Sequence, residues 1–166
     1  MDQDTEIPDA AVAPEEFRVA MGRFPSGVVV VTTRCQDGTP RGFTASSFCS
    51  VSLEPPMVLV CLANSADSAT SFARCDRFAV SVLSPVHRSL AERFATKGAD
   101  KFASGGLRIG PGGLPTVERA LSELDCVAHA RHPAGDHTVL IGRVTGVRLG
   151  EGSPMDYYDR SFRTLA

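Results

Sequence analysis

Short β-branched runs separated by turn residues set the main limit on how this chain can fold. The run Val28–Cys35 leads into the turn signal Asp37-Gly38, after which Arg41–Phe48 returns as a second extended stretch. A Gly135-Asp136 turn joins two longer alternating stretches later in the chain. Helical stretches are too few for regular strand and helix alternation. The pattern therefore predicts an antiparallel sheet built from hairpins.

Further elements fit the same architecture. Additional strands are expected over Met57–Leu62 and Arg77–Leu83, and Leu124, Cys126, Ala128 and Ala130 are expected to share one face of a strand. Helices are expected from Pro14 to Phe24, from Ser68 to Arg74 and from Pro85 to Ala95, and the glycine-rich segment Gly98–Gly113 is expected to be an irregular connection. About six strands would leave costly open edges, so the sequence predicts a mainly β fold, a small closed antiparallel barrel with a few peripheral helices.

The totals limit the domain organisation and the partners. The 166 residues suit one domain, which we place at 14–166 after a loosely ordered arm at 1–13. The net charge of −2 and the absence of a basic patch exclude nucleic acid as an expected partner. The longest apolar runs are too short to span a bilayer and the N-terminus lacks the features of a secretory signal, so we expect no membrane association and a cytoplasmic location.

Sequence motifs exclude several chemistries. The five cysteines form no CxxC pair, so neither a metal site nor a disulfide framework is expected. The dinucleotide fingerprint GxGxxG, the phosphate loop GxxxxGK[ST] and the nucleophile motif GxSxG are all missing. A Rossmann site and a serine hydrolase are therefore not supported.

A run of hydroxyl side chains precedes the double proline at Pro55-Pro56. Apolar residues interrupt the run, as expected for a half-buried strand rather than a free loop, although a solvated loop remains the alternative. Hydroxyl groups and backbone N–H groups on such a strand can bind the phosphate, ribityl chain or ring edge of a cofactor. The hydroxyl residues are Thr44, Ser46, Ser47, Ser50 and Ser52. Ser68 is expected to cap a helix that faces the same phosphate.

Four sequence blocks together resemble the flavin reductase components of two-component monooxygenases. They occur in the family's order and cover the chain from Phe17 to the C-terminus. The blocks are FPSGVVVVTT from Phe24, GFTASSFCSVSLEPP from Gly42, RFA from Arg93 with DKF from Asp100, and GDH from Gly135 with Ile141-Gly142. Ser26 and Ser46 stand where family members often have Thr and Asn, and both substitutions keep a hydrogen-bonding side chain.

The resemblance implies a split β-barrel of the FMN-binding, Greek-key type that forms a homodimer. Such a protein uses NADH or NADPH to reduce FMN or FAD and supplies free reduced flavin to a partner oxygenase. The resemblance makes His137 the candidate catalytic residue, acting on the nicotinamide. The candidate cofactor-binding residues are Thr44, Ala45, Ser46, Ser47, Ser50, Ser52, Cys61, Leu62, Ala63, Ser68, Phe72, Arg93, Lys101 and Phe102.

Several alternatives stay open at this stage. A lone histidine after a hairpin turn, such as His137, is often only a solvated polar residue, and Arg93 and Lys101 could be ordinary surface charges. Tyr157-Tyr158 and Arg160 could close over the flavin or pack in a dimer. For the whole protein the alternatives are a flavin-binding or storage module and a split-barrel oxidase with tightly bound FMN.

Overall fold

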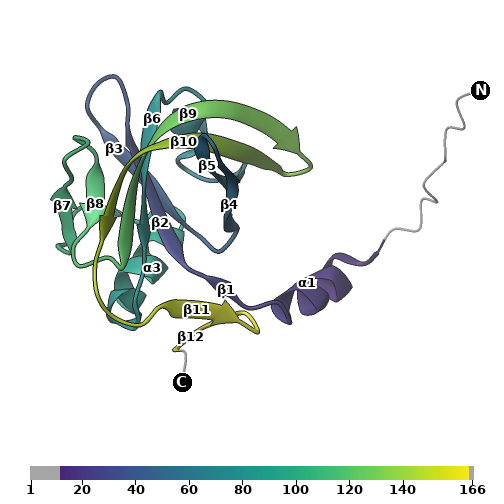
Figure 1. The fold of residues 1–166 in the computed structure, drawn as a ribbon. Helices are drawn as coiled ribbons and strands as arrows, with labels where there is room; N and C mark the ends of the chain where they lie inside the picture. Colours follow the sequence, from purple (N-terminus) through teal and green to yellow (C-terminus); the bar gives the residue numbers. More distant parts are fainter. Residues whose placement is uncertain (1–11, 165–166) are drawn as a thin grey trace, which may run out of the picture.

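The computed structural model describes residues 12–164, which form a strongly bent antiparallel sheet with helices at its margins (Figure 1). Seven strands make up this sheet, in the order β3-β2-β6-β9-β10-β5-β4. Their bounds are β2 Val29–Arg34, β3 Pro40–Ala45, β4 Phe48–Leu53, β5 Pro56–Ala63, β6 Arg77–Val82, β9 Ser122–Ala134 and β10 His137–Leu149. The predicted mainly β fold is confirmed. Of the arm predicted at 1–13, residues 1–11 lie outside the described residues.

Strand β2 explains the β-branched run that stands out in the sequence. Val29 and Val31 face the core inside the sheet, while Val28 and Val30 face a second core beneath α3. Because both faces of this stretch are buried, its residues are continuously apolar rather than alternating. The β2–β3 hairpin pairs Val29 with Ala45 and Arg34 with Pro40, as predicted.

The long hairpin β9–β10 turns at Gly135-Asp136, and Gly135 takes the positive φ of 58° that this tight turn needs. One expectation for β9 is wrong. Leu124 and Ala128 pack with the inner core, but Ala130 does not, because a register shift lies between them. Ala128 pairs with Gly142 and Ala130 pairs with Ile141, so the bulge changes the face that follows it.

The sheet is not closed. The closed barrel expected from the number of strands is therefore wrong, whereas the open sheet agrees with the split barrel that the resemblance implies. Its two edges are β3 and β4, which are consecutive in the chain and separated only by Ser46-Ser47. The chain thus leaves one edge of the sheet and enters the other within two residues. This crossing point lies beside β5, which pairs with β4 from Phe48↔Val60 onward.

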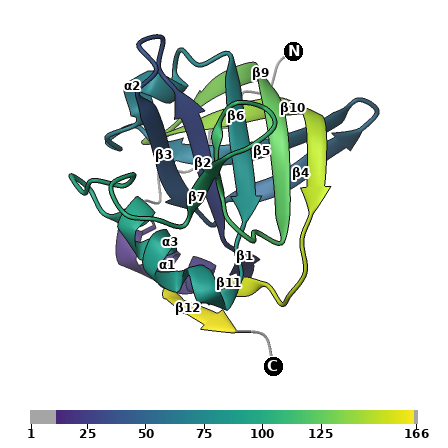
Figure 2. The ribbon, with the colours of Figure 1, turned by 90° about the vertical axis from the view of Figure 1, so that its left-hand side faces the viewer.

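The helices are shorter than the sequence pattern suggests. Helix α1 spans Pro14–Gly22 and α2 spans Ala69–Phe72. The predicted helix over 85–95 divides into a 3-10 turn, η1 Pro85–His87, and α3 Arg88–Ala95. Figure 2 shows α3 lying across one end of the sheet, where it packs mainly against β3. Among residues 12–164, no helix is long and apolar enough to cross a membrane.

The connection after α3 is more ordered than predicted. Within and after the glycine-rich segment, β7 Leu107–Ile109 and β8 Pro115–Val117 form a small hairpin. An ion-pair network fixes it to the main sheet: Arg108 binds the buried Glu123 of β9, and Arg148 of β10 binds both Glu123 and Asp125. A third small sheet joins β1 Ser26–Gly27 to the C-terminal strands β11 Met155–Tyr158 and β12 Ser161–Thr164.

Candidate functional site

The crossing point between the two sheet edges forms one wall of a cavity of about 420 Å³, which we call the split cavity. Strand β5 forms the adjoining wall, and the segments after β5 and after α3 also contribute to the lining. Its lining contains most of the candidate site residues named from the sequence: Thr44, Ala45, Ser46, Ser47, Cys61, Leu62, Ala63, Ser68, Lys101 and His137. The fold therefore brings together residues that are up to 93 positions apart in the chain, from Thr44 to His137.

Two of the lining hydroxyl groups already have partners within the protein. Ser47 Oγ donates to Cys61 O and accepts from Cys61 N–H, both at 3.2 Å, so it extends the pairing of β4 with β5 by one residue. Thr44 Oγ1 donates to Ala91 O at 2.6 Å and attaches β3 to α3. Their hydroxyl protons are thus engaged. The hydroxyl group of Ser46 and the backbone of this segment are better placed to serve a ligand.

Ser68 shows the opposite situation. It stands at the N-cap position of α2, as predicted, but its side chain makes no capping hydrogen bond. The residue is only 2% exposed, and Ser68 Oγ has no hydrogen-bond partner among the described residues. A buried hydroxyl group without a partner is costly, so this lining residue fits the polar group of a bound molecule.

The charged residues of the cavity gather near Ser68. Lys97 and Lys101 both contribute to the lining, and Lys101 Nζ lies 3.6 Å from Asp67 Oδ2. The same carboxylate oxygen accepts a 2.6 Å hydrogen bond from Gly98 N–H. This hydrogen bond, with the nearby lysine charges, lowers the pKa of Asp67, so the carboxylate is ionised at neutral pH. This part of the cavity holds two cations and one anion.

His137 lies on the β10 side of the cavity. It is the first residue of β10 and pairs with Ala63 of β5. Its Nδ1 is 2.7 Å from Asp136 Oδ1, and this hydrogen bond lowers the pKa of the Asp136 carboxyl. With Nδ1 held by the carboxylate, Nε2 is the ring nitrogen that can contact a ligand.

Besides Phe102, four residues named from the sequence do not line the split cavity. Ser50 and Ser52 lie further along β4, opposite Val58 and Met57, because the strand carries them away from the crossing point. Phe72 is buried in the core, edge-on to Phe43. Arg93 Nη2 donates to the carbonyl groups of Ser104 and Gly105 and so holds the glycine-rich segment instead. Their predicted part in cofactor binding finds no support in the geometry.

Phe102 takes an intermediate position. It lines a neighbouring cavity of about 360 Å³, which shares Gly42, Asp67, Ser68 and Lys101 with the split cavity. We call this space the outer cavity.

Sequence reasoning missed Asp67, Lys97 and Gly42. Gly42 lines the split cavity beneath Phe94, and a Cβ atom at this position would lie 2.7 Å from the Phe94 ring. The signal for Lys97 was its place immediately after the predicted helix, on the same segment as Lys101. Asp67 was harder to identify from the sequence, because it is a single acidic residue next to Ser68 in the turn after β5.

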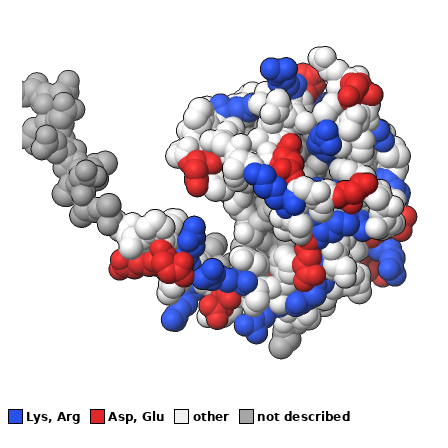
Figure 3. All heavy atoms as spheres, turned by 180° about the vertical axis from the view of Figure 1, so that it is seen from behind, with Lys and Arg blue, Asp and Glu red and all other residues white. Residues whose placement is uncertain are grey.

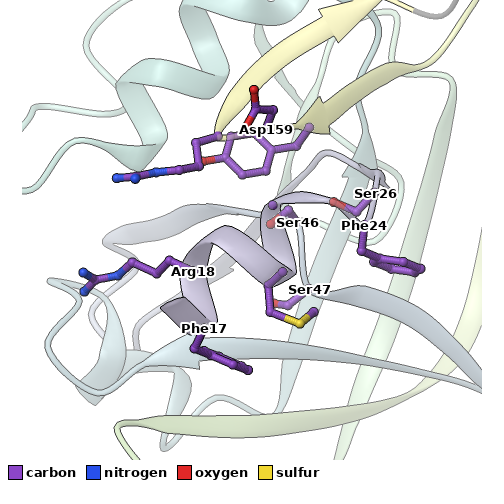
Figure 4. A pocket seen from close by; sticks show the side chains of 11 residues that line it. Phe17, Arg18, Phe24, Ser26, Ser46, Ser47 and Asp159 are labelled. Atoms are coloured by element: carbon purple, nitrogen blue, oxygen red, sulfur yellow. The ribbon is translucent and has the colours of Figure 1, made fainter. Parts of the chain in front are cut away.

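A second large cavity of about 550 Å³ adjoins the first and shares Ser46 and Ser47 with it. Helix α1 and the turn after β11 line it from opposite sides (Figure 4). Arg160 of that turn binds Glu15 of α1 at 2.9 Å, and Tyr157 packs against Phe162. From behind, the surface is hollowed between α1 and the barrel, and charges of both signs are scattered over this face (Figure 3).

The chain that forms this open-edged barrel and its cavity matches a known family. A model of the flavin reductase like domain matches residues 21–166. The chain belongs to this family. The resemblance inferred from the four sequence blocks is therefore confirmed, as are the predicted split-barrel fold and the assignment to flavin-reducing oxidoreductases.

Relatives of this flavin reductase-like protein cover nearly all of the chain. It is 50% identical over 150 residues to the actinorhodin polyketide dimerase of Streptomyces coelicolor. This match covers 90% of this chain and 85% of that protein. It is 39% identical over 159 residues to the NADH-dependent flavin reductase of a Rhodococcus species, covering 95% and 89% of the two chains. Two Rhizobium meliloti relatives are longer, and the chain spans 42% and 59% of their lengths.

A solved structure supports the same placement. The NADH:FAD oxidoreductase SgcE6 of Streptomyces globisporus C-1027, in complex with NAD and FAD fragments, superposes with a TM-score of 0.85 at 35% identity. The match covers 94% of this chain and 96% of that one. The barrel is therefore shared with an oxidoreductase whose complex contains NAD and FAD fragments.

Proposed function

We propose that this protein is an NADH:flavin oxidoreductase that reduces FMN or FAD and releases the reduced flavin to a partner monooxygenase. The observation that carries the proposal is the split cavity, where backbone and hydroxyl groups of the crossing point face Cys61–Ala63 and cations gather at one end. Relatives named as an NADH-dependent flavin reductase and as the reductase subunit of a flavin-dependent monooxygenase support the choice of nucleotide and partner.

The cavity suits a flavin bound without a covalent link. Its phosphate would lie at the cationic end, near Lys97, Lys101 and the unpartnered hydroxyl group of Ser68. Its ring would run along Cys61–Ala63, where the small side chains of Cys61 and Ala63 are partly exposed. The lining supplies neutral donors and two lysines, which hold a nucleotide through hydrogen bonds and charge. Flavin can therefore enter and leave as a substrate.

The chemistry asks for positioning more than for reactive side chains. Bound flavin supplies the hydride acceptor, and the protein must hold the nicotinamide against it in the correct orientation. His137 is suited to this task, since Asp136 fixes its ring and Nε2 can contact the nicotinamide. Ser47 maintains the shape of the site by joining the crossing point to Cys61.

A homodimer completes the proposal. Helix α1 has no buried residue, and Phe17, Met21 and Phe24 are 59%, 51% and 69% exposed. These apolar side chains line the cavity shared with Ser46 and Ser47. An exposed apolar face of this kind usually marks a protein interface, and self-association in symmetric pairs is the commonest case. A second copy seated on α1 would lie next to the split cavity.

The deciding experiment measures NADH oxidation by protein stripped of flavin, with and without added FMN, FAD or riboflavin. We expect oxidation only when flavin is supplied. A flavin-storage module would oxidise no NADH under any condition, and an oxidase with tightly bound FMN would need no added flavin. Either result would refute the proposal. The predicted cytoplasmic location agrees with the use of NADH and remains a prediction.

A further inference from the structure

The cationic end of the split cavity contains one negative charge that a phosphate-binding site does not need. Of the described residues that line this cavity, Asp67 alone carries a carboxylate group. It lies between the split cavity and the outer cavity and contributes to the lining of both. Its side chain is 38% exposed, so the charge is open to a ligand rather than enclosed in the core.

Asp67 acts on Lys101 directly. The ammonium group of Lys101 is 3.6 Å from the Asp67 carboxylate and its side chain is only 12% exposed. A phosphate group that binds Lys101 therefore comes close to Asp67 and must compete with it for the same cation. FMN carries a phosphomonoester with nearly two negative charges at neutral pH, whereas riboflavin has none. The carboxylate thus opposes the first ligand and is indifferent to the second.

Asp67 also has a second role that must be separated from its charge. It accepts the Gly98 N–H hydrogen bond and so holds the segment that carries Lys97 and Lys101. Gly98 has a positive φ of 74°, which fixes the direction of the chain at this point. A substitution that retains the acceptor but removes the charge isolates the electrostatic effect, and asparagine meets both conditions.

We propose that Asp67 is a specificity-determining residue that weakens the binding of phosphorylated flavins and thereby favours release of the reduced flavin. This inference rests on the proposed function, which requires flavin to leave the site. A flavin held by two lysines without opposition would dissociate slowly, because affinity differences arise mainly in the dissociation rate. The two lysines keep this end of the cavity attractive to phosphate, while the carboxylate reduces its net positive charge.

The test compares flavin binding by three proteins: the unmodified chain, Asp67→Asn and the control Asp100→Asn. Asp100 lies on the same segment and lines only the outer cavity, where it accepts the Phe102 N–H, so its substitution removes the same charge outside the split cavity. Dissociation constants for FMN and riboflavin are measured by fluorescence titration at low and high salt. Thermal melting checks that each variant is folded.

We expect Asp67→Asn to bind FMN about fivefold more tightly at low salt. The repulsion between two unit charges about 4 Å apart in water is about 1 kcal/mol, and this free energy corresponds to about a fivefold change in the dissociation constant. Riboflavin affinity should be unchanged, the FMN effect should shrink at high salt, and Asp100→Asn should match the unmodified protein. Unchanged or weaker FMN binding would overturn the inference. An equal change for both ligands would also overturn it, because Asp67 would then act only through the shape of the loop.

The two proposals fail separately. Flavin-dependent NADH oxidation by the unmodified protein tests the function and does not involve Asp67→Asn. If that activity is present, and the ratio of FMN affinity to riboflavin affinity is the same in the unmodified protein and in Asp67→Asn, only the role of Asp67 is refuted.

Discussion

Ser47 and Cys61 are joined by a pair of hydrogen bonds, with Ser47 Oγ 3.2 Å from both the nitrogen and the carbonyl oxygen of Cys61. One hydroxyl group thus attaches the link between the two edge strands to β5, directly beyond the Phe48↔Val60 pair at which the β4–β5 ladder begins. The contact holds the crossing point against β5.

The first prediction concerns this contact. Ser47→Ala should lower the free energy of unfolding by about 1 kcal/mol and weaken FMN and riboflavin binding by similar factors, because it loosens the wall rather than removing a phosphate ligand. Ser46→Ala is the matched control, since no hydrogen bond of Ser46 Oγ occurs among the described residues. It should leave stability unchanged. Loss of FMN binding alone in Ser47→Ala would show that this hydroxyl binds phosphate after all.

The second prediction concerns His137. His137→Ala should reduce kcat/KM for NADH about fivefold, which corresponds to the loss of one neutral hydrogen bond of about 1 kcal/mol, with little change in flavin affinity. His132→Ala, an exposed histidine on the neighbouring β9, provides the control. Steady-state kinetics with varied NADH and separate flavin titrations distinguish the two effects. An unchanged kcat/KM for NADH in His137→Ala would show that His137 is a solvated surface residue without a role in the reaction.

The hairpins, the strand positions and the hydroxyl-rich wall could be predicted because their signals are local. Alternation and turn residues depend on neighbours in the sequence, and the run at 42–53 carried both. The charge network of Arg148 with Glu123 and Asp125 could not be predicted, since single charges on separate strands give no periodic signal. The same holds for Arg93, whose partners Ser104 and Gly105 depend on the path of an irregular segment.

The hydrogen-bond partners of the hydroxyl groups could not be predicted from the sequence either. The pattern predicted a half-buried strand, and the structure leaves Thr44 partly buried and Ser47 exposed. Whether their protons serve a ligand or the protein depends on which carbonyl group lies opposite. Thr44 meets Ala91 of α3 and Ser47 meets Cys61 of β5, and both contacts arise from tertiary packing.

The third prediction concerns pH and the buried His87. Its Nδ1 accepts the Ser84 N–H at 3.0 Å and its Nε2 lies 2.9 Å from Glu118 O, an arrangement that requires the neutral ring. Burial lowers the pKa of His87 below its usual value of 6.5. As pH falls through that value, the unfolded chain binds a proton that the folded chain excludes, so stability decreases from there toward the lower folded pKa.

The measurement is urea unfolding of the unmodified protein and of His87→Gln over this acidic range. The unmodified protein should lose up to about 1.4 kcal/mol more per pH unit than the variant. His129→Gln, which changes an exposed histidine, should retain the full dependence. Parallel curves for the unmodified protein and His87→Gln would exclude His87 as the source.

The fourth prediction concerns the network that anchors β7. The Glu123 side chain is only 5% exposed and Arg148 contacts it through two nitrogen atoms. Arg148→Met would leave the two carboxylates with Arg108 as their one remaining cation in the network, and should cost about 3 kcal/mol in the free energy of unfolding. Arg143→Met, an exposed arginine on the same strand, should cost far less. Similar losses in both variants would show that the network contributes little.

The fifth prediction concerns association through α1. Phe24→Asp places a charge on the exposed apolar face of Phe17, Met21 and Phe24, where burial of an unpaired carboxylate against a second copy would be unfavourable. We expect the unmodified protein to be a dimer by light scattering and Phe24→Asp to shift toward monomer at the same concentration. Ile109→Asp makes the same change at a comparably exposed residue on β7, on the opposite side of the barrel in Figure 1, and should remain dimeric. Because the cavity beside α1 shares Ser46 and Ser47 with the split cavity, loss of the dimer should also reduce flavin-dependent NADH oxidation. A monomeric unmodified protein, or a Phe24→Asp variant as dimeric as Ile109→Asp, would refute this interface.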